Sequence, residues 1–496
     1  MTNTSTWSAT GYEPQALGDL TMYIGGEWVE AADRSRLDVF DPAVGATIAT
    51  VPNAKSDDVD QAVVAARSAL EGPWGAFSPR DRSTILYRIA NVIRRDCTDL
   101  ATLEMQDTGK TLAAAIGDIE EAAYLFEYYA GWVTKISGEI PPVGGRSLSL
   151  IRSKPVGVAA LITPWNFPLL MVAQKAAPAL AAGCTCIVKP AEQTPLSALR
   201  LGAIAEEVGL PPGTLNVITG DGASAGVPLV RHLGIDMISF TGSVPVGKDI
   251  GAVAGGNLKR VTLELGGKSA SIVFPDADLE RAVEGLCNAG FFNQGQVCGA
   301  CSRIYLHEDV YDTVLERIGH FVESLIPGHG LDPSTTLGPL ISAEHRRRVA
   351  SFVERGREEG GEILFEGTVP AQPSLRGGYF FAPVVVGGAS PTATLSQNEV
   401  FGPVVTVQSF RTTDEVIGLV NGTDYGLAGS VWTTDLTTAL SVADAIDSGT
   451  VWVNDSLKAV SEAMWGGVKN SGVGRELGRA GLDEYLEKRQ IYLTLP

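Results

Sequence analysis

The feature that most constrains the fold is an alternation of short apolar runs and helical stretches, which begins at Val156. The apolar runs are VGVAALI, CTCIVK, TLNVITG and DMISF. Between them, apolar residues recur at helical spacing, as in LLMVAQKAAPALAAG and SALRLGAIAEEVG. Short apolar strands that alternate with helices predict a parallel, doubly wound sheet, which binds ligands at the carboxyl ends of its strands. We therefore expect an α/β fold with a nucleotide site.

Two further regions extend this α/β pattern. Amphipathic helices are predicted between Asp57 and Ala130, as in VDQAVVAARSAL. From Gly266 a second series of strand-like runs begins, again separated by helical segments such as YDTVLERIGHFVESL. This series includes SASIVF, RIYLH, VVTVQSF, SVWT and TVWVN. Because a chain of 496 residues exceeds one ordinary domain, we expect these runs to form a second α/β domain.

Two other segments predict a small β arm. In SGEIPPVGGRSLSLIRSKP, Pro and Gly mark a turn and Leu148 and Leu150 alternate with polar residues, which is typical of a hairpin. The chain also closes with an apolar strand, Ile491 to Leu495. An uncovered apolar edge favours aggregation, so we expect these strands to pair between subunits of a homodimer or homotetramer.

Composition argues against several classes of protein. Apolar residues make up 45% and charged residues 19% of the chain, as in globular proteins. The net charge of −19 argues against nucleic acid and anionic membrane as partners. The apolar runs are shorter than the roughly 20 residues that a membrane span requires. The six cysteines are sparse and mostly in apolar contexts, which favours a reducing cytoplasm over a secreted disulfide framework.

The segment FFNQGQVCGACSR holds the best candidate for a nucleophile. Cys298 follows a Gly-Gln turn among small and polar residues, a setting that suits a reactive thiol. A buried structural thiol is an equally good interpretation of this segment alone. The C-G-A-C pair with Cys301 indicates either a redox pair or half a zinc site. No second Cys/His pair follows, so we expect no metal, and a reversible Cys298–Cys301 disulfide stays a hypothesis.

Two more side chains are candidates for chemistry. Glu264, in VTLELGGKS, lies between apolar strand residues and a Gly-Gly turn, where burial would raise its pKa toward that of a general base. The alternative for Glu264 is an ion-paired strand end. Asn166, in LITPWNFPLL, follows a strand and carries an amide donor that could stabilise an oxyanion. An isolated Asn is more often a turn residue, so neither side chain decides the function alone.

A phosphate site is predicted at MISFTGSVPVG. Here a strand leads through a turn of small residues into a helix that opens at Ser243, and Gly242 and Gly247 would let the backbone approach a phosphate. No G-x-G-x-x-G follows an early strand, so the usual dinucleotide fingerprint is absent. The sequence therefore predicts a variant of the dinucleotide-binding fold.

Seven segments, in this order and at these spacings, resemble the aldehyde dehydrogenase superfamily: TPWNFP, KPAEQTPL, FTGS, LELGGKS, NQGQVC, EVFGPV and GGVKNSGVGRELG. The likeness runs from about Tyr23 to the C-terminus and implies an NAD(P)-dependent, non-phosphorylating enzyme. Glu264, which CoA-acylating relatives usually lack, indicates a hydrolytic one. The implied organisation is a Rossmann-like NAD-binding domain of residues 20–134 and 156–264, a catalytic domain of residues 265–480, and an oligomerisation hairpin and strand of residues 135–155 and 481–496.

By this resemblance Cys298 is the nucleophile, which attacks the aldehyde carbon to give a thiohemiacetal. Asn166 and the backbone N–H of Cys298 would hold the oxyanion, and hydride would pass to the nicotinamide. Glu264 would then activate the water that hydrolyses the thioester. A thiolate suits both steps because it attacks and leaves well. Lys175 and Glu476 match positions that the family uses near a proton exit path, although a solvated ion pair is the alternative.

The resemblance also implies contacts with the cofactor. Ser243 would contact the pyrophosphate and Glu399 the nicotinamide ribose. Glu192 closely follows the strand CTCIVK, where its carboxylate would accept from ribose hydroxyls and repel a 2′-phosphate, so NAD is favoured over NADP. The full set of expected cofactor residues is Thr163, Trp165, Lys189, Glu192, Gly242, Ser243, Gly266, Glu399 and Phe401.

The expected substrate pocket points to an amino- or trimethylammonio-aldehyde. Trp465 stands where many relatives have Phe and where aminoaldehyde and betaine aldehyde dehydrogenases often have Trp. Aromatic residues could form part of a box for an ammonium group, and acidic residues could add negative charge. These residues are Phe167, Phe292, Trp465, Asp118, Glu121 and Asp455. Gln174, also in this pocket, argues against such a substrate, because these enzymes often have Trp there.

The alternative is a broad-specificity aliphatic or aromatic aldehyde dehydrogenase, in which the aromatic residues wall an apolar channel and the acids face water. No arginine pair near the mouth would clamp a second carboxylate, which disfavours succinic semialdehyde. An inactive structural or binding relative is disfavoured because Cys298, Glu264 and Asn166 are all present. None of the five histidines is assigned a catalytic role.

Overall fold

The computed structural model describes residues 7–8, 11–12, 14 and 16–495, so Pro496 of the expected C-terminal segment lies outside the described residues. Its larger sheet has eight strands in the order β23-β13-β12-β9-β10-β11-β4-β5. The central strands β13, β12, β9, β10 and β11 are parallel. Among these parallel strands, the chain forms β9 first, adds β10 and β11 on one side, and then adds β12 and β13 on the other. This order creates a switch point between β9 and β12, where open α/β sheets bind ligands.

The strands of this sheet have the following bounds: β4 Met22–Ile24, β5 Glu27–Val29, β9 Val158–Ile162, β10 Thr185–Lys189, β11 Leu215–Val217, β12 Met237–Gly242, β13 Arg260–Leu265 and β23 Gly472–Val473. Two-residue β23 pairs with β13, although it falls in the segment 265–480 that the sequence assigned to the other domain. A strand this short has no alternation of its own that would have revealed the pairing.

Helices cover both faces of the eight-stranded sheet, as its apolar strands predict. In β9, Ala159 and Leu161 pack into one core, mainly with α2 to α6, whereas Val158 and Ala160 pack into another with α1, α7 and α8. Successive side chains of a strand point to opposite faces, so a strand buried on both is apolar throughout. The helices are α1 Ser56–Glu71, α2 Pro79–Arg95, α3 Cys97–Thr108, α4 Leu112–Trp132, α5 Pro168–Ala182, α6 Leu196–Glu207, α7 Val227–Arg231 and α8 Val244–Gly256.

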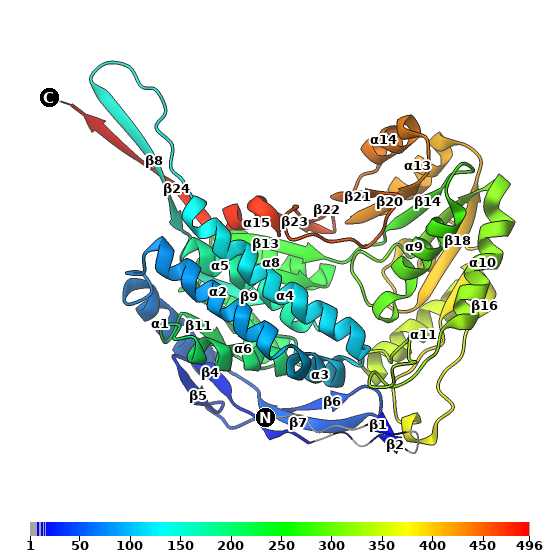
Figure 1. Cartoon of the computed structure of the whole chain (residues 1–496), viewed down its shortest axis with the longest axis horizontal. Helices are drawn as coiled ribbons and strands as arrows, with labels where there is room; N and C mark the ends of the chain where they lie inside the picture. The colour runs from blue at the N-terminus through cyan, green and yellow to red at the C-terminus, as the bar shows by residue number, and fades with distance from the viewer. Residues whose placement is uncertain (1–6, 9–10, 13, 15, 496) are drawn as a thin grey trace.

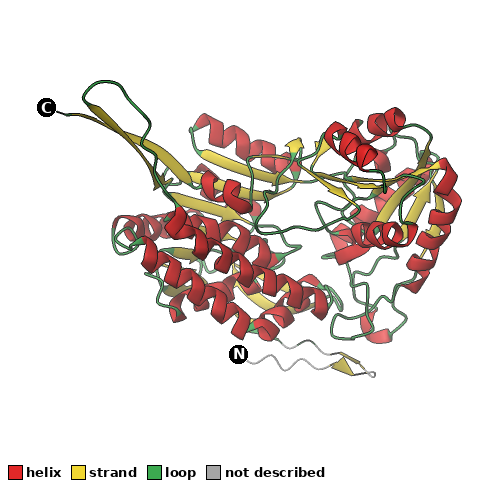
Figure 2. Cartoon of the chain, turned by 45° about the horizontal axis from the view of Figure 1, so that its top comes forward, coloured by secondary structure: helices red, strands yellow, loops and turns green. Residues whose placement is uncertain are grey.

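A second sheet has seven strands in the order β16-β17-β18-β15-β14-β20-β21, and only its edge strand β16 is antiparallel. Figures 1 and 2 show the two sheets in separate lobes. The chain crosses between them from β13 to β14. The strands and helices of this lobe are β14 Ala270–Val273, β15 Arg303–His307, β16 Glu362–Glu366, β17 Val384–Gly387, β18 Val404–Phe410, β20 Ala428–Trp432, β21 Thr450–Val453, α9 Leu279–Phe291, α10 Tyr311–Ser324, α11 Ala343–Glu358, α12 Thr394–Gln397, α13 Thr413–Asn421 and α14 Leu436–Ala445. The expected α/β fold is confirmed.

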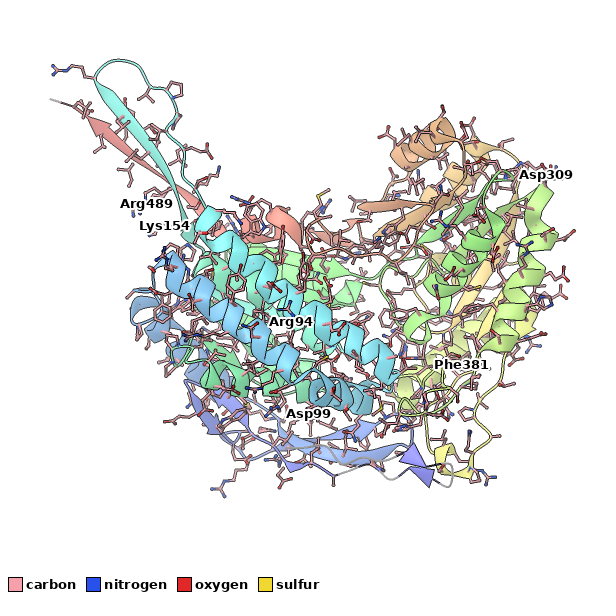
Figure 3. The ribbon with its side chains drawn as sticks, in the orientation of Figure 1. Arg94, Asp99, Lys154, Asp309, Phe381 and Arg489 are labelled. Carbon is pink, nitrogen blue, oxygen red and sulfur yellow. The ribbon has the colours of Figure 1, made fainter. Side chains whose placement is uncertain are left out.

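A two-stranded ribbon of β8 (Ser147–Pro155) and β24 (Leu486–Thr494) projects from the first lobe (Figure 1). Leu148 pairs with Leu493 inside one chain, so the prediction that these two strands pair with each other between subunits is wrong. The physical reason is that α15 (Gly478–Glu484) ends beside the end of β8, where Val156 N donates to Tyr485 O. The chain that leaves α15 therefore enters β24 already next to β8 of the same chain. Figure 3 shows Lys154 and Arg489 where the ribbon meets the body.

Smaller strands complete the fold. They are β1 Trp7–Ser8 with β2 Gly11–Tyr12; β3 Gly18–Asp19, β6 Arg36–Asp41 and β7 Ala46–Pro52; and β19 Tyr425–Gly426 with β22 Val468–Lys469. Among the described residues, no helix is long and apolar enough to cross a membrane.

Candidate active site

A cavity of about 430 Å³ lies at the switch point of the first sheet, between the two lobes. Its wall combines the segments that follow β9, β12, β13 and β21 with the loop that precedes β15. Many of the expected site residues meet there: Trp165, Asn166, Phe167, Gln174, Gly242, Ser243, Glu264, Gly266, Phe292, Cys298, Glu399, Phe401 and Trp465. Expected residues outside this wall are Thr163, Lys175, Lys189, Glu192, Asp455 and Glu476.

Cys298 lies on a tightly held loop ahead of β15. Asn293 and Gln294 precede it with left-handed backbone angles, φ 49° and 59°, which are uncommon for residues other than glycine. Gln296 secures the loop, because its Nε2 donates to Asn293 O at 3.3 Å and its Oε1 accepts from Ile341 N at 3.0 Å. The thiol is free, half-buried and part of the cavity wall. These contacts favour the nucleophile over the structural thiol.

The protonation of Cys298 follows from its surroundings. Burial raises the pKa of the thiol to about 12, and the carboxylates of Glu399 and Glu264 add to the rise. The thiol is therefore neutral near pH 7, and its attack on a carbonyl carbon requires that a base take its proton.

Asn166 has an amide that is oriented and partly unused. Its Nδ2 donates to Gln296 O at 2.8 Å, which takes one of its two N–H groups and leaves the second for an oxyanion. Its Oδ1 is buried and has no hydrogen-bond partner. On the backbone, Asn166 O accepts from Lys110 Nζ at 2.9 Å and from Asn293 Nδ2 at 3.2 Å. The residue is thus held through its side-chain amide and through its backbone carbonyl oxygen.

Glu264, the penultimate residue of β13, carries a buried carboxylate, and the residue is 4% exposed. Neither of its oxygens has a hydrogen-bond partner. Burial raises its pKa well above the usual range, and the charge of Glu476 raises it further, whereas Lys175 and Arg475 lower it. A carboxylate in this state can accept a proton near neutral pH, as a general base must.

Behind Glu264 lies a buried polar cluster around Glu476. Its carboxylate forms an ion pair with Lys175 and accepts from Gln174 Nε2 at 2.6 Å and Ser239 Oγ at 3.1 Å. Lys175 is fully buried and Glu476 is 4% exposed, so the alternative of a solvated ion pair is wrong. Gln174 also lines the cavity, and it thereby connects the substrate side to this cluster.

The far side of the cavity fits a nucleotide. Ser243 caps the N-terminus of α8 without using its hydroxyl for the cap, which leaves this helix end open to a phosphate. At Gly242 a Cβ would lie 2.5 Å from the Phe240 ring, and at Gly266 it would lie 2.2 Å from Glu399 Oε2. The two glycines therefore permit close approaches that a side chain would block. Burial raises the pKa of Glu399 to about 7, and Gly267 N donates to its Oε1 at 3.2 Å.

Thr163, Lys189 and Glu192 lie at or just after the carboxyl ends of β9 and β10. Lys189 is buried, and burial lowers its pKa, while Glu192 lies 3.8 Å away with 39% of its side chain exposed. Thr163 Oγ1 is buried without a hydrogen-bond partner. An acceptor, a cation and an unpaired hydroxyl at neighbouring strand ends fit the hydroxyls of a ribose.

Comparisons with known proteins identify the family of the chain. The model of the aldehyde dehydrogenase family matches residues 28–491. The chain belongs to this family. It is 44% identical to a betaine aldehyde dehydrogenase of Bacillus subtilis, over 95% of the chain and 97% of the relative, and 42% identical to a phenylacetaldehyde dehydrogenase of Pseudomonas fluorescens, over 95% of each. The NAD+ complex of an aldehyde dehydrogenase from Bacillus cereus superposes with a TM-score of 0.94 at 40% identity, covering 96% of this chain and 97% of that one.

Several wall residues of this family member, Trp452 among them, escaped the sequence analysis. His345 and Arg348, on α11, line the cavity beside Trp165 and Phe401. The His345 ring packs edge-on against Trp165, and its Nε2 donates to Phe401 O at 2.6 Å. The only sequence signal was the basic run at residues 346–348, which looks like an ordinary solvated helix face.

The second cysteine of the C-G-A-C pair, Cys301, does not line the cavity and packs in a small apolar cluster. Cys301 is fully buried, and its pKa is raised by burial and lowered by the neighbouring hydroxyls of Ser271 and Ser430. Both thiols are free, so no Cys298–Cys301 disulfide is present. Among the described residues there is also no cluster of His, Cys, Asp or Glu that could hold a metal ion.

The substrate side of the cavity is aromatic and acidic. Phe167 and Phe292 stack with centroids 6.4 Å apart, and Trp452 faces Trp465 at 6.1 Å. Glu121 lines the wall and accepts from Ser461 Oγ at 2.5 Å. The other expected acids contribute less charge: Asp118 pairs with Lys110 at 2.5 Å, and Asp455 lies outside the wall.

Proposed function

We propose that this aldehyde dehydrogenase uses NAD to oxidise an aldehyde to a carboxylic acid, through a thioester on Cys298. One observation carries the proposal. A free thiol, an amide with an unused N–H and a buried carboxylate without a hydrogen-bond partner line a single cavity. These are the nucleophile, oxyanion donor and base that acyl transfer to water requires.

The residues divide the reaction between them. Cys298 loses its proton to water, and the thiolate Sγ attacks the aldehyde carbon while the carbonyl electron pair moves to oxygen. The resulting oxyanion accepts from Asn166 Nδ2 and from the backbone N–H of Cys298. When bound, NAD supplies the hydride acceptor for the oxidation. Glu264 then removes a proton from the water that attacks the thioester carbon, so the C–S bond breaks and the acid leaves.

The cofactor preference rests on Glu192. Its half-exposed carboxylate would accept from ribose hydroxyls and repel a 2′-phosphate, which favours NAD over NADP. Lys189, 3.8 Å from Glu192, would share this ribose site. The Bacillus cereus relative described above binds NAD+.

For the substrate we propose an amino- or trimethylammonio-aldehyde. An ammonium group would meet the faces of Phe167, Phe292, Trp452 and Trp465 and the carboxylate of Glu121. The betaine aldehyde dehydrogenase of Bacillus subtilis supports this class. The alternative is a broad range of aliphatic or aromatic aldehydes, which the phenylacetaldehyde dehydrogenase of Pseudomonas fluorescens supports. An aldehyde panel separates the two: cationic aldehydes should exceed hexanal in kcat/KM, and a clear advantage for hexanal would select the alternative.

The thioester itself is tested with Glu264→Gln, which keeps the size of the side chain and removes the base. One equivalent of NADH should form in a burst before turnover stalls, with an acyl group on Cys298 by mass spectrometry. A variant that lacks the burst shows that Glu264 is needed to deprotonate Cys298. Full steady-state turnover would overturn the assignment of Glu264 and point to Glu476.

We further propose a homodimer or homotetramer in the cytoplasm. The ribbon of β8 and β24 exposes Tyr492, Leu493 and Leu495, and a paired but uncovered apolar ribbon suits a contact with a second copy. Six free thiols suit a reducing compartment. Light scattering checks the assembly, and an active monomer would contradict it.

A further inference from the structure

Lys110 is a buried cation that the mechanism above does not use. It lies in the turn between α3 and α4 and is 1% exposed. Its Nζ donates to Asp118 Oδ2 at 2.5 Å and to Asn166 O at 2.9 Å, and it lies 4.6 Å from the centre of the Phe167 ring. All three partners line the cavity. The ammonium is therefore directly behind the wall that holds the oxyanion donor.

A buried ammonium is costly unless it is paired and hydrogen-bonded, and here the pairing is with residues of the site itself. Asp118 balances the charge, and the carbonyl of Asn166 takes a second N–H. The contact with the Asn166 peptide fixes the residue whose side chain faces the reacting oxygen. A displacement of about 1 Å at such a donor is enough to lower a rate substantially.

The segment that begins at Asn166 is held at its other end, Leu169, by a side chain of α3. Glu104, on α3, accepts from Leu169 N at 2.5 Å and from Ser197 Oγ at 2.8 Å. The segment 166–169 is thus clamped at both ends by side chains from the C-terminal half of α3 and the turn that follows. Glu104 holds the start of α5, and Lys110 holds Asn166.

We propose that Lys110 is a positioning residue of the oxyanion hole, acting through Asn166, an inference that rests on the proposed function of this cavity. It fixes the Asn166 peptide so that the unused N–H of Nδ2 faces the oxygen that becomes negative. The Lys110–Asp118 pair is then part of the reaction apparatus as well as of the fold.

The direct test is Lys110→Met, which removes the ammonium and keeps an unbranched chain. The rate of the NADH burst should fall by roughly 10- to 100-fold, less than the 10² to 10³ expected for loss of the donor itself. Binding of NAD, measured by fluorescence quenching, should not change. Lys259→Met is the matched control, because Lys259 also donates to two backbone carbonyls, those of Val230 and His232, away from the cavity. Its burst should equal that of the unmodified protein.

A double-mutant cycle separates positioning from mere structural support. If Lys110 acts through Asn166, then Lys110→Met should cost little in an Asn166→Ala background. If it supports only the fold, the two losses should multiply. Multiplied losses, or an unchanged burst in Lys110→Met, would overturn the proposal.

Lys110→Met leaves Asp118 buried without its partner, which endangers folding. The same cycle is therefore repeated in an Asp118→Asn background, where no unpaired carboxylate remains and the same coupling is expected. The proposed function fails separately, since it requires NADH formation by the unmodified protein. If the unmodified protein forms NADH but the losses from Lys110→Met and Asn166→Ala multiply, then the positioning role is overturned and the proposed function stands.

Discussion

The reaction centre and the substrate mouth of the cavity are built in different ways. At the reaction centre, each group is fixed through the backbone: Cys298 by a left-handed loop, Asn166 through its own peptide, and Glu264 at the end of a central strand. At the mouth, the wall consists of side chains such as Glu121 of α4 and Trp465 of the segment after β21. A substitution at the reaction centre removes a group that the reaction of every aldehyde requires, whereas a substitution in the side-chain wall changes which aldehyde fits and leaves the chemistry in place. Mutations at the two ends should therefore fail in different ways.

The largest effect is expected at the nucleophile. Cys298→Ala should abolish NADH formation with every aldehyde, because no bond to the carbonyl carbon can form. Stopped-flow absorbance of NADH measures this loss, and unchanged NAD binding serves as the control for folding. Residual turnover with any aldehyde would mean that the reaction does not pass through Cys298.

Next in size is the oxyanion donor. Asn166→Ala should keep NAD binding and lower turnover by roughly 10² to 10³, the usual cost of one lost donor. Steady-state kcat with saturating NAD gives the comparison. An unchanged kcat would remove Asn166 from the mechanism and, with it, the role of Lys110.

The difference between the two regions also explains what the sequence could reveal. The α/β fold was predictable from the alternating apolar runs, and the shared site of Cys298, Glu264 and Asn166 was predictable from the resemblance that seven segments carry together. The mouth was less predictable. Asp118 forms an ion pair with Lys110, and Asp455 does not line the wall. The sequence could not reveal either fact, because such contacts depend on tertiary packing.

At the cofactor side, the exposed carboxylate of Glu192 should change the ratio of kcat/KM for NAD to that for NADP, and not the rate of the chemical step. Glu192→Gln should narrow the preference for NAD over NADP by roughly five- to tenfold, since a charge pair at about 4 Å is worth about 1 kcal/mol in water-like surroundings. The measurement is kcat/KM for each cofactor with one aldehyde. Equal ratios before and after the change would show that Glu192 does not oppose the 2′-phosphate.

A smaller ratio change is expected at the mouth. Glu121→Gln should lower kcat/KM for a cationic aldehyde severalfold and leave that for hexanal unchanged, because only the cation loses an attraction. Equal losses for both aldehydes would show that Glu121 supports the wall structure and does not select charge. The ratio of the two aldehydes cancels any difference in the amount of active protein.

The smallest effect is expected at Glu476, which links the two regions. Gln174 of the substrate wall donates a hydrogen bond to Glu476, and the charge of Glu476 raises the pKa of Glu264. Glu264 must be ionised to act as a base, and its pKa is raised first by burial and then by the charge of Glu476. Glu476→Gln removes that charge, so the pKa of Glu264 should fall. The acid limb of the kcat profile should then move to lower pH by on the order of one unit. Glu121→Gln is the matched control, because its carboxylate bonds Ser461 and not the groups around Glu264. A limb that stays in place, or moves to higher pH, would show that the water-activating group lies outside the Glu264 and Glu476 pair.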